Sequence, residues 1–142
     1  FYHLLQCTTP LQNNKSQFSL QTTAAQLSEL EQKASRVPTG GNPVLLCFGM
    51  DGTDKADGTY KRLGGHAVVA YGVEYKGDGW FDGWGWEPGY DSRILLYDCN
   101  YPKGVTYLYF NHGTDSFKLK QYDYDIRLER ACNDITLLDA VN

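Results

Sequence analysis

The sequence has no long hydrophobic run and no cluster of basic residues. Its longest apolar stretches, residues 44–48 and 67–71, are far shorter than the roughly 20 residues of a membrane-spanning helix. A basic segment followed by an apolar one, the mark of a signal peptide, is also missing. Lys and Arg number 13 against 17 Asp and Glu, so the net charge is −4 at pH 7. An acidic chain without a basic patch binds phosphate backbones poorly, so we expect neither a membrane span nor a nucleic-acid partner.

Methionine is nearly absent, because Met50 is the only one and residue 1 is Phe. We therefore expect the chain to start by cleavage of a precursor or as a cloned fragment of one. Residues 1–6 have the composition of the last turns of a helix, and Pro10 forbids its continuation. This favours a chain that is the C-terminal portion of a longer domain.

Paired cysteine motifs are absent as well. Cys7, Cys47, Cys99 and Cys132 are scattered without a C-x-x-C pair. Four cysteines can close two disulfides in three ways, and the spacing is not that of a dense disulfide scaffold. Structural zinc sites draw ligands from short paired spacings, so the pattern argues against one. The redox compartment stays open on this evidence.

Glycine and tyrosine are abundant, with 15 and 11 among 142 residues, and both favour sheets with tight turns. A helix is predicted over residues 24–36, capped by Thr22 or Thr23, because apolar residues recur there every three or four positions. Strands are predicted over 44–48, 65–75, 93–98, 105–111, 116–122 and 135–139. The fold class is thus α+β in a single domain over 1–142, with a helical part at 1–40 and an antiparallel sheet of five or six strands at 43–142.

Residues 49–63 are predicted to be a polar loop. It carries Asp51, Asp54 and Asp57, whose spacing of three does not match the alternate ligands of an EF-hand loop. A solvated acidic loop is the better interpretation. No metal and no cofactor are expected anywhere in the chain.

The strongest chemical signal is a histidine behind two glycines at the start of a strand, Gly64-Gly65-His66-Ala67-Val68-Val69-Ala70-Tyr71-Gly72. A later strand ends in Asp98, and the two side chains can meet if the strands pair. A carboxylate that orients an imidazole is half of a nucleophilic triad. The alternative is a structural histidine that is hydrogen-bonded at a strand start.

This histidine strand resembles that of papain-like cysteine peptidases. The later segment Ile94-Leu95-Leu96-Tyr97-Asp98, with Asn100-Tyr101-Pro102 behind it, is similar to the acidic-residue strand of bacterial members, both secreted enzymes and bacteriocin-leader peptidases. The resemblance covers roughly residues 26–111. It implies that His66 is the general base and Asp98 its orienting partner, with Asn100 as the alternate for that role.

The nucleophilic cysteine is where the chain departs from this family, in which it lies well upstream at the start of a long helix. Cys47 lies in a predicted strand and close to His66, so it is only an alternate nucleophile. Cys7 follows helix-like residues instead of preceding them. Cys99 is expected in the core, and Cys132 is expected to be structural or disulfide-bonded. We expect the nucleophile on a missing or separate N-terminal fragment of the same precursor.

All three tryptophans lie in the glycine-rich segment 80–86, between the two strands of interest. Trp84 and Trp86, with Gly65 beside the histidine, are candidate substrate-binding residues, and the alternative is that the tryptophans cover a sheet edge. The sequence thus predicts a papain-like, bacterial, secreted cysteine peptidase acting on peptides or proteins. Rival hypotheses are a non-catalytic peptide- or glycan-binding module and a transglutaminase- or amidase-like acyl transferase.

Overall fold

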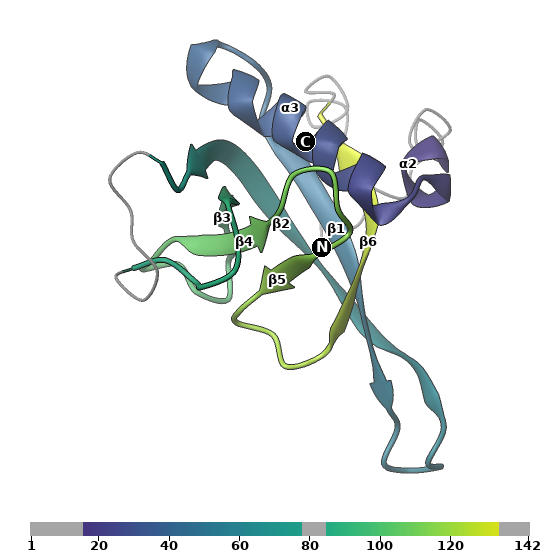
Figure 1. Ribbon diagram of the computed structural model, residues 1–142. Helices are drawn as coiled ribbons and strands as arrows, with labels where there is room; N and C mark the ends of the chain where they lie inside the picture. The colour runs from purple at the N-terminus through teal and green to yellow at the C-terminus, as the bar shows by residue number, and fades with distance from the viewer. Residues whose placement is uncertain (1–15, 78–84, 134–142) are drawn as a thin grey trace.

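The computed structural model describes residues 16–77 and 85–133, which form a helical region and a six-stranded antiparallel sheet, an α+β arrangement (Figure 1). The elements are α2 (Ser16–Leu20), α3 (Thr23–Arg36), the short 3₁₀ turn η2 (Val37–Thr39), β1 (Val44–Thr53), β2 (Tyr60–Tyr75), β3 (Ser92–Tyr97), β4 (Thr106–Phe110), β5 (Phe117–Leu119) and β6 (Asp125–Cys132). The predicted fold class is confirmed, whereas its papain-like assignment stays a prediction. None of the described helices is long and apolar enough to cross a membrane.

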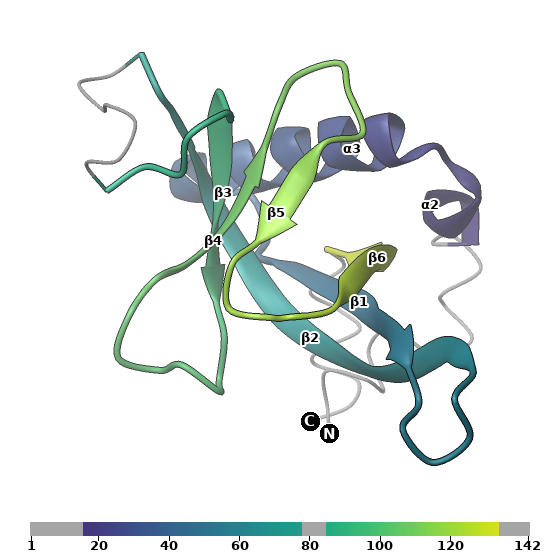
Figure 2. The same ribbon diagram turned by 60° about the horizontal axis from the view of Figure 1, so that its bottom comes forward.

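The strands lie in the order β5-β4-β3-β2-β1-β6, and every neighbouring pair is antiparallel. The sheet curls into a half-barrel, so its two outermost strands, β5 and β6, face each other across the open side (Figure 2). Strands β2 and β3 lie side by side in the middle of this order. Because they are neighbours, residues of β2 lie close to residues at the end of β3.

Helix α3 forms where the apolar spacing predicted it, and it packs on the concave face of the sheet. The Thr22 hydroxyl accepts a hydrogen bond from the Ala25 N–H at 3.2 Å, which satisfies one orphan donor of the first turn. Leu27, Leu30 and Ala34 form its buried stripe. The helical region ends at Gly40, whose φ of 107° is left-handed and open to glycine.

The core is formed by alternate residues of each strand. On β1 and β2, the inward set includes Leu46, Phe48 and Val68, whereas Cys47 and Ala67 belong to a second cluster on the outer face. Period-two alternation therefore separates the two faces. His66, two positions before Val68, lies on the inner side and contacts the Phe48 ring.

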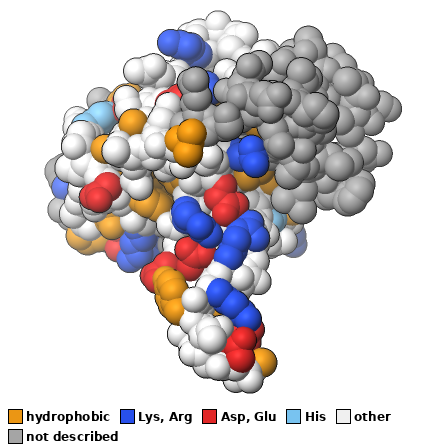
Figure 3. Space-filling model, turned by 90° about the vertical axis from the view of Figure 1, so that its right-hand side faces the viewer, with side chains coloured by type: hydrophobic (Ala, Val, Ile, Leu, Met, Phe, Trp, Pro, Cys, Tyr) orange, Lys and Arg blue, Asp and Glu red, His pale blue; other side chains and the backbone are white. Residues whose placement is uncertain are grey.

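The predicted polar loop over residues 49–63 is wrong for most of its length. Strands β1 and β2 continue as a two-stranded ribbon, and only residues 54–59 connect them. Side-chain pairs stabilise the ribbon: Arg62 donates two hydrogen bonds of 3.0 Å to Glu129, and Arg127 pairs with Asp51 at 3.0 Å. Figure 3 shows acidic and basic side chains alternating along this face. Such cross-strand charge pairs support strands in polar sequence.

The remaining aspartates of the ribbon are also paired. Lys61 binds both Asp54 and Asp57 at 2.9 Å, and each carboxylate also caps a turn at the tip of the ribbon. Lys61 and the backbone donors thus partner both of these carboxylates.

Strand β6 was not predicted, although Ile126 and Leu128 alternate with charged residues as a half-buried strand requires. It pairs with β1 and places Leu128 in the core. The predicted strand at 135–139 and the helical end at 1–6 lie outside the described residues.

Candidate functional site

The pairing of β2 with β3 brings His66 and Asp98 together. In that pairing Val69 lies opposite Tyr97, so Asp98, the first residue after β3, is close to the inner-facing side chains of β2. His66 Nε2 lies 2.8 Å from Asp98 Oδ1. The predicted contact between the two side chains is therefore present.

This contact decides which ring nitrogen is basic. An ionised carboxylate can only accept hydrogen bonds, so Nε2 donates its proton to Asp98 and, in the neutral ring, the lone pair lies on Nδ1. Nδ1 has no hydrogen-bond partner among the described residues. The histidine is thus held in the tautomer that a general base needs, with its accepting nitrogen available.

Asp98 is completely buried, with 0% of its side chain exposed, whereas His66 is 18% exposed. Burial, the largest influence, raises the pKa of Asp98. Hydrogen bonds from Tyr122, His66 and the Asn100 backbone N–H outweigh it, so the pKa lies below its ordinary value. Asp98 is therefore an anion at neutral pH, and its charge has three donors.

Tyr122 is the functional residue that the sequence did not point to. Its hydroxyl donates to Asp98 Oδ2, and its ring packs on Phe48 with centroids 5.3 Å apart. Burial and the bond to Asp98 raise the pKa of the phenol, so the hydroxyl keeps its proton and remains a donor. It lies 24 residues from Asp98. No motif of the sequence connects the two.

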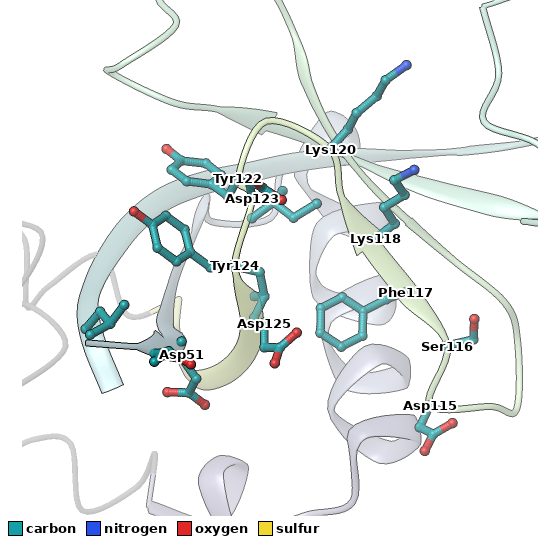
Figure 4. A pocket seen from close by; sticks show the side chains of 15 residues that line it. Asp51, Asp115, Ser116, Phe117, Lys118, Lys120, Tyr122, Asp123, Tyr124 and Asp125 are labelled. Atoms are coloured by element: carbon teal, nitrogen blue, oxygen red, sulfur yellow. The ribbon is translucent and has the colours of Figure 1, made fainter. Parts of the chain in front are cut away.

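A hollow of about 1020 Å³ opens beside Tyr122, on the open side of the half-barrel between β5 and β6. Figure 4 shows Tyr122, Tyr124 and Phe117 along it, with Asp125 between the last two. Tyr122 lines this hollow, whereas His66, Asp98 and Cys99 are not among its lining residues.

The cysteines are placed differently from the sequence expectation. Cys99 is exposed, so its predicted core position is wrong. The physical reason is that β3 ends at Tyr97, and beyond a strand end alternation no longer sets a side chain's direction. Its sulfur and ligand atoms of His66 and Asp98 all lie within 4.8 Å of one another, so these residues could together hold a metal ion.

Cys47 lies on the outer face, away from His66, and is disulfide-bonded. A disulfide sulfur cannot act as a thiolate nucleophile, so in this state the alternate nucleophile has no basis. Cys132 is buried in the same outer cluster, which agrees with a structural role. Cys7 lies outside the described residues.

Asn100 is close to the site, but it does not replace Asp98. Its amide nitrogen lies 3.4 Å from His66 Nε2, farther than the carboxylate, and its backbone N–H donates to Asp98 Oδ1 at 2.9 Å. Asn100 therefore supports the aspartate.

Trp86, one of the candidate substrate-binding residues, lies away from this site. Trp86 is 3% exposed and lies over the outer face, where its ring stacks on the buried Arg93 at 4.5 Å. Arg93 in turn donates to Glu74 at 2.8 Å and to the Gly85 carbonyl at 2.7 Å. Trp86 thus packs on the outer face of the sheet, on the side opposite to His66. Trp84 lies outside the described residues.

A side chain at position 65 would lie on the face of the sheet opposite to that of His66. A Cβ there would lie 2.2 Å from Arg62 Nη2 and 3.2 Å from the Phe48 carbonyl oxygen. Gly49, which is paired with Gly65, would likewise place a Cβ 2.5 Å from Glu129 Oε2. The two glycines make room for the Arg62–Glu129 pair, which gives a structural reason for the glycine before His66.

The arrangement is therefore an oriented imidazole with a buried carboxylate, a supporting phenol, and an exposed thiol nearby. Comparison with known proteins adds nothing to it: no protein-family model, no curated protein and no solved structure matches this chain.

Proposed function

We propose that this chain supplies the base and the orienting acid of a thiol-dependent peptidase, with His66 as base and Asp98 as its partner. The observation that carries the proposal is the 2.8 Å contact of His66 Nε2 with a buried, ionised carboxylate, which leaves Nδ1 as the basic atom. A structural histidine would be satisfied at both nitrogens or buried. This one is partly exposed and has an open acceptor among the described residues.

The chemistry follows from that tautomer. A cysteine thiol gives its proton to Nδ1, and Asp98 stabilises the resulting imidazolium through Nε2. The thiolate adds to a peptide carbonyl carbon, and the C–N bond breaks as the imidazolium returns its proton to the leaving amine. Water then hydrolyses the thioester, with His66 again accepting a proton, which restores the thiol.

The nucleophilic thiol is proposed to come from a segment other than those described, as part of the same precursor. Two observations support this. Cys47 is disulfide-bonded on the outer face, and Cys132 is buried there. Cys99 is the alternative within the described chain, because the residue is exposed and its sulfur lies within 4.8 Å of the dyad atoms. It directly follows the residue that holds Nε2, whereas the nucleophile must meet Nδ1.

A pulse of limiting iodoacetamide at neutral pH tests the proposal, read by intact mass and peptide mapping of the purified protein with any polypeptide that copurifies. The thiolate that His66 activates should alkylate first, and His66→Gln should slow it at least about tenfold, since a base contributes a factor of about 10² or more. His112→Asn is the matched control, because it removes a histidine far from Asp98. The proposal fails if no cysteine depends on His66, and fast Cys99 labelling would move the nucleophile into this chain.

A further inference from the structure

The exposed thiol beside the dyad has a second consequence. His66, Asp98 and Cys99 each offer one ligand atom, and these atoms lie within 4.8 Å of one another. The three side chains range from completely buried at Asp98, through 18% exposed at His66, to exposed at Cys99. An ion can reach this cluster from solvent and still have a rigid ligand at its base.

The donor set is that of zinc. An imidazole nitrogen, a thiolate and a carboxylate oxygen are the three side-chain ligand types of zinc sites, and three protein ligands leave a fourth position for water. Bond lengths near 2.0 to 2.3 Å place neighbouring ligand atoms about 3.3 to 3.6 Å apart in a tetrahedral site. His66 Nε2 and Asp98 Oδ1 are 2.8 Å apart, so they need to separate by only part of an ångström.

The surroundings already hold the carboxylate as a zinc ligand requires. Tyr122 donates to Asp98 Oδ2, and the Asn100 N–H donates to Oδ1 at 2.9 Å. Such outer hydrogen bonds orient a ligating carboxylate and strengthen metal binding. A carboxylate oxygen has two lone pairs, so Oδ1 can keep the Asn100 bond and still bind an ion.

We propose that His66, Asp98 and Cys99 bind one zinc ion reversibly, and that the zinc-bound state is the inactive form of the base. Binding to Nε2 replaces the proton that this nitrogen donates to Asp98. That proton moves to Nδ1, and the Cys99 thiol releases its own proton to solvent. Nδ1 then carries a hydrogen and cannot accept one. Only the inhibition rests on the proposed function, whereas the binding does not.

A second histidine among the described residues shows why the cluster is selective. His112 also has two carboxylates, but Glu31 lies 2.9 Å from Nε2 and Asp91 lies 3.2 Å from Nδ1. The two acids are on opposite nitrogens, so one ion cannot bind the ring and both carboxylates. His112→Asn is therefore a matched control.

The test is metal binding to the whole 142-residue chain with the Cys47 disulfide intact. Zinc is titrated against a chromophoric chelator, and cobalt(II) replaces it for the sulfur-to-cobalt charge-transfer band in the near ultraviolet. We expect one zinc per chain and a thiolate band. Cys99→Ser, at an exposed position, should remove the band and weaken binding at least about 100-fold, the upper end for loss of a mere supporting residue. His112→Asn should leave both unchanged.

The proposal is overturned if the wild-type chain binds less than one zinc in this assay, or if Cys99→Ser binds as tightly as wild type. A band that survives Cys99→Ser would place the metal on another sulfur and would also overturn it. Repeating the iodoacetamide pulse with zinc present separates the two proposals. Zinc binding without any His66-dependent cysteine would leave the metal site standing and refute the peptidase.

Discussion

Replacing Tyr122 by phenylalanine isolates the hydrogen bond that the sequence did not reveal. The substitution removes only the hydroxyl that donates to Asp98 Oδ2, and it keeps the ring that packs on Phe48 and His66. Because Asp98 is completely buried, no water replaces the lost donor at low cost. A hydrogen bond to a charged group contributes about 1.5 to 3 kcal/mol, so we expect Tyr122→Phe to lower the free energy of unfolding by that amount at pH 7.

The fall in the free energy of unfolding caused by Tyr122→Phe should be larger at neutral pH than at acidic pH. The pKa of Asp98 in the folded chain lies below its ordinary value, so its charge stabilises the fold at neutral pH, and this stabilisation disappears as pH falls through the folded pKa. Without Tyr122, one of the hydrogen bonds that lower the pKa of Asp98 is lost, so this pKa rises and the variant's carboxyl takes up its proton at a higher pH. The difference in free energy of unfolding between wild type and Tyr122→Phe should therefore decrease as pH is lowered below about 4. It should approach about 1 kcal/mol, the contribution of a neutral hydrogen bond.

Urea unfolding followed by tryptophan fluorescence at pH 7 and pH 3.5 measures both gaps. Tyr101→Phe is the matched control, because its exposed hydroxyl makes only a 3.5 Å contact with the Gln121 carbonyl. Its effect should stay within about 0.5 kcal/mol at both pH values. A Tyr122→Phe effect as small as the control, or one of equal size at the two pH values, would refute the charged hydrogen bond.

Three further changes test the scaffold by the same unfolding assay. Arg93→Met should lower the free energy of unfolding by about 3 kcal/mol, because it removes a buried cation and leaves Glu74 without its partner, and one third of the Glu74 side chain is exposed. A decrease of less than about 1 kcal/mol would contradict this. Thr22→Ala should cost about 1 kcal/mol through the lost helix cap, and Thr22→Ser should restore most of it. The hydrogen bond to Glu31 raises the pKa of His112 against burial, so this pair stabilises the fold below about pH 6.5, and the stabilisation is lost as pH rises through the folded pKa. His112→Asn should thus be less stable than wild type at pH 6 by up to about 1 kcal/mol and closer to it at pH 8.5, and a gap that widens with pH would reverse the assignment.

The helix and the central strands were predictable because one local pattern controls each of them. Leu27, Leu30 and Ala34 recur at helical spacing, and all three are buried. The apolar and β-branched residues over 67–70 predict a strand whichever strands lie next to it in the sheet. The approach of Asp98 to His66 was predictable on one condition, that β2 and β3 pair, which antiparallel neighbours joined by a loop commonly do.

The rest depends on contacts between distant segments. The ribbon formed by β1 and β2 has a polar sequence. It is stabilised as a strand pair because Arg127 and Glu129 of β6 form ion pairs with Asp51 and Arg62 of the ribbon. Cys99 was assigned to the core by extending strand alternation past Tyr97, where the strand has ended. Tyr122 reaches Asp98 only because the sheet curls and carries the chain after β5 back over the site. Curvature of this kind has no local signature.

Because β5 is an edge strand, Tyr122 is held less firmly in the site than His66 and Asp98 are. His66 lies in β2 and Asp98 directly follows β3, so the ladder between these two central strands, which opens only near global unfolding, holds the backbone of both residues in place. Tyr122 follows a three-residue strand that is bonded on one side only, to β4. Fraying of that edge removes the phenol and leaves the imidazole and carboxylate in place. Amide hydrogens of β5 should therefore exchange with solvent far sooner than those of β2, and the anion at Asp98 alternates between three donors and two while the fold stays intact.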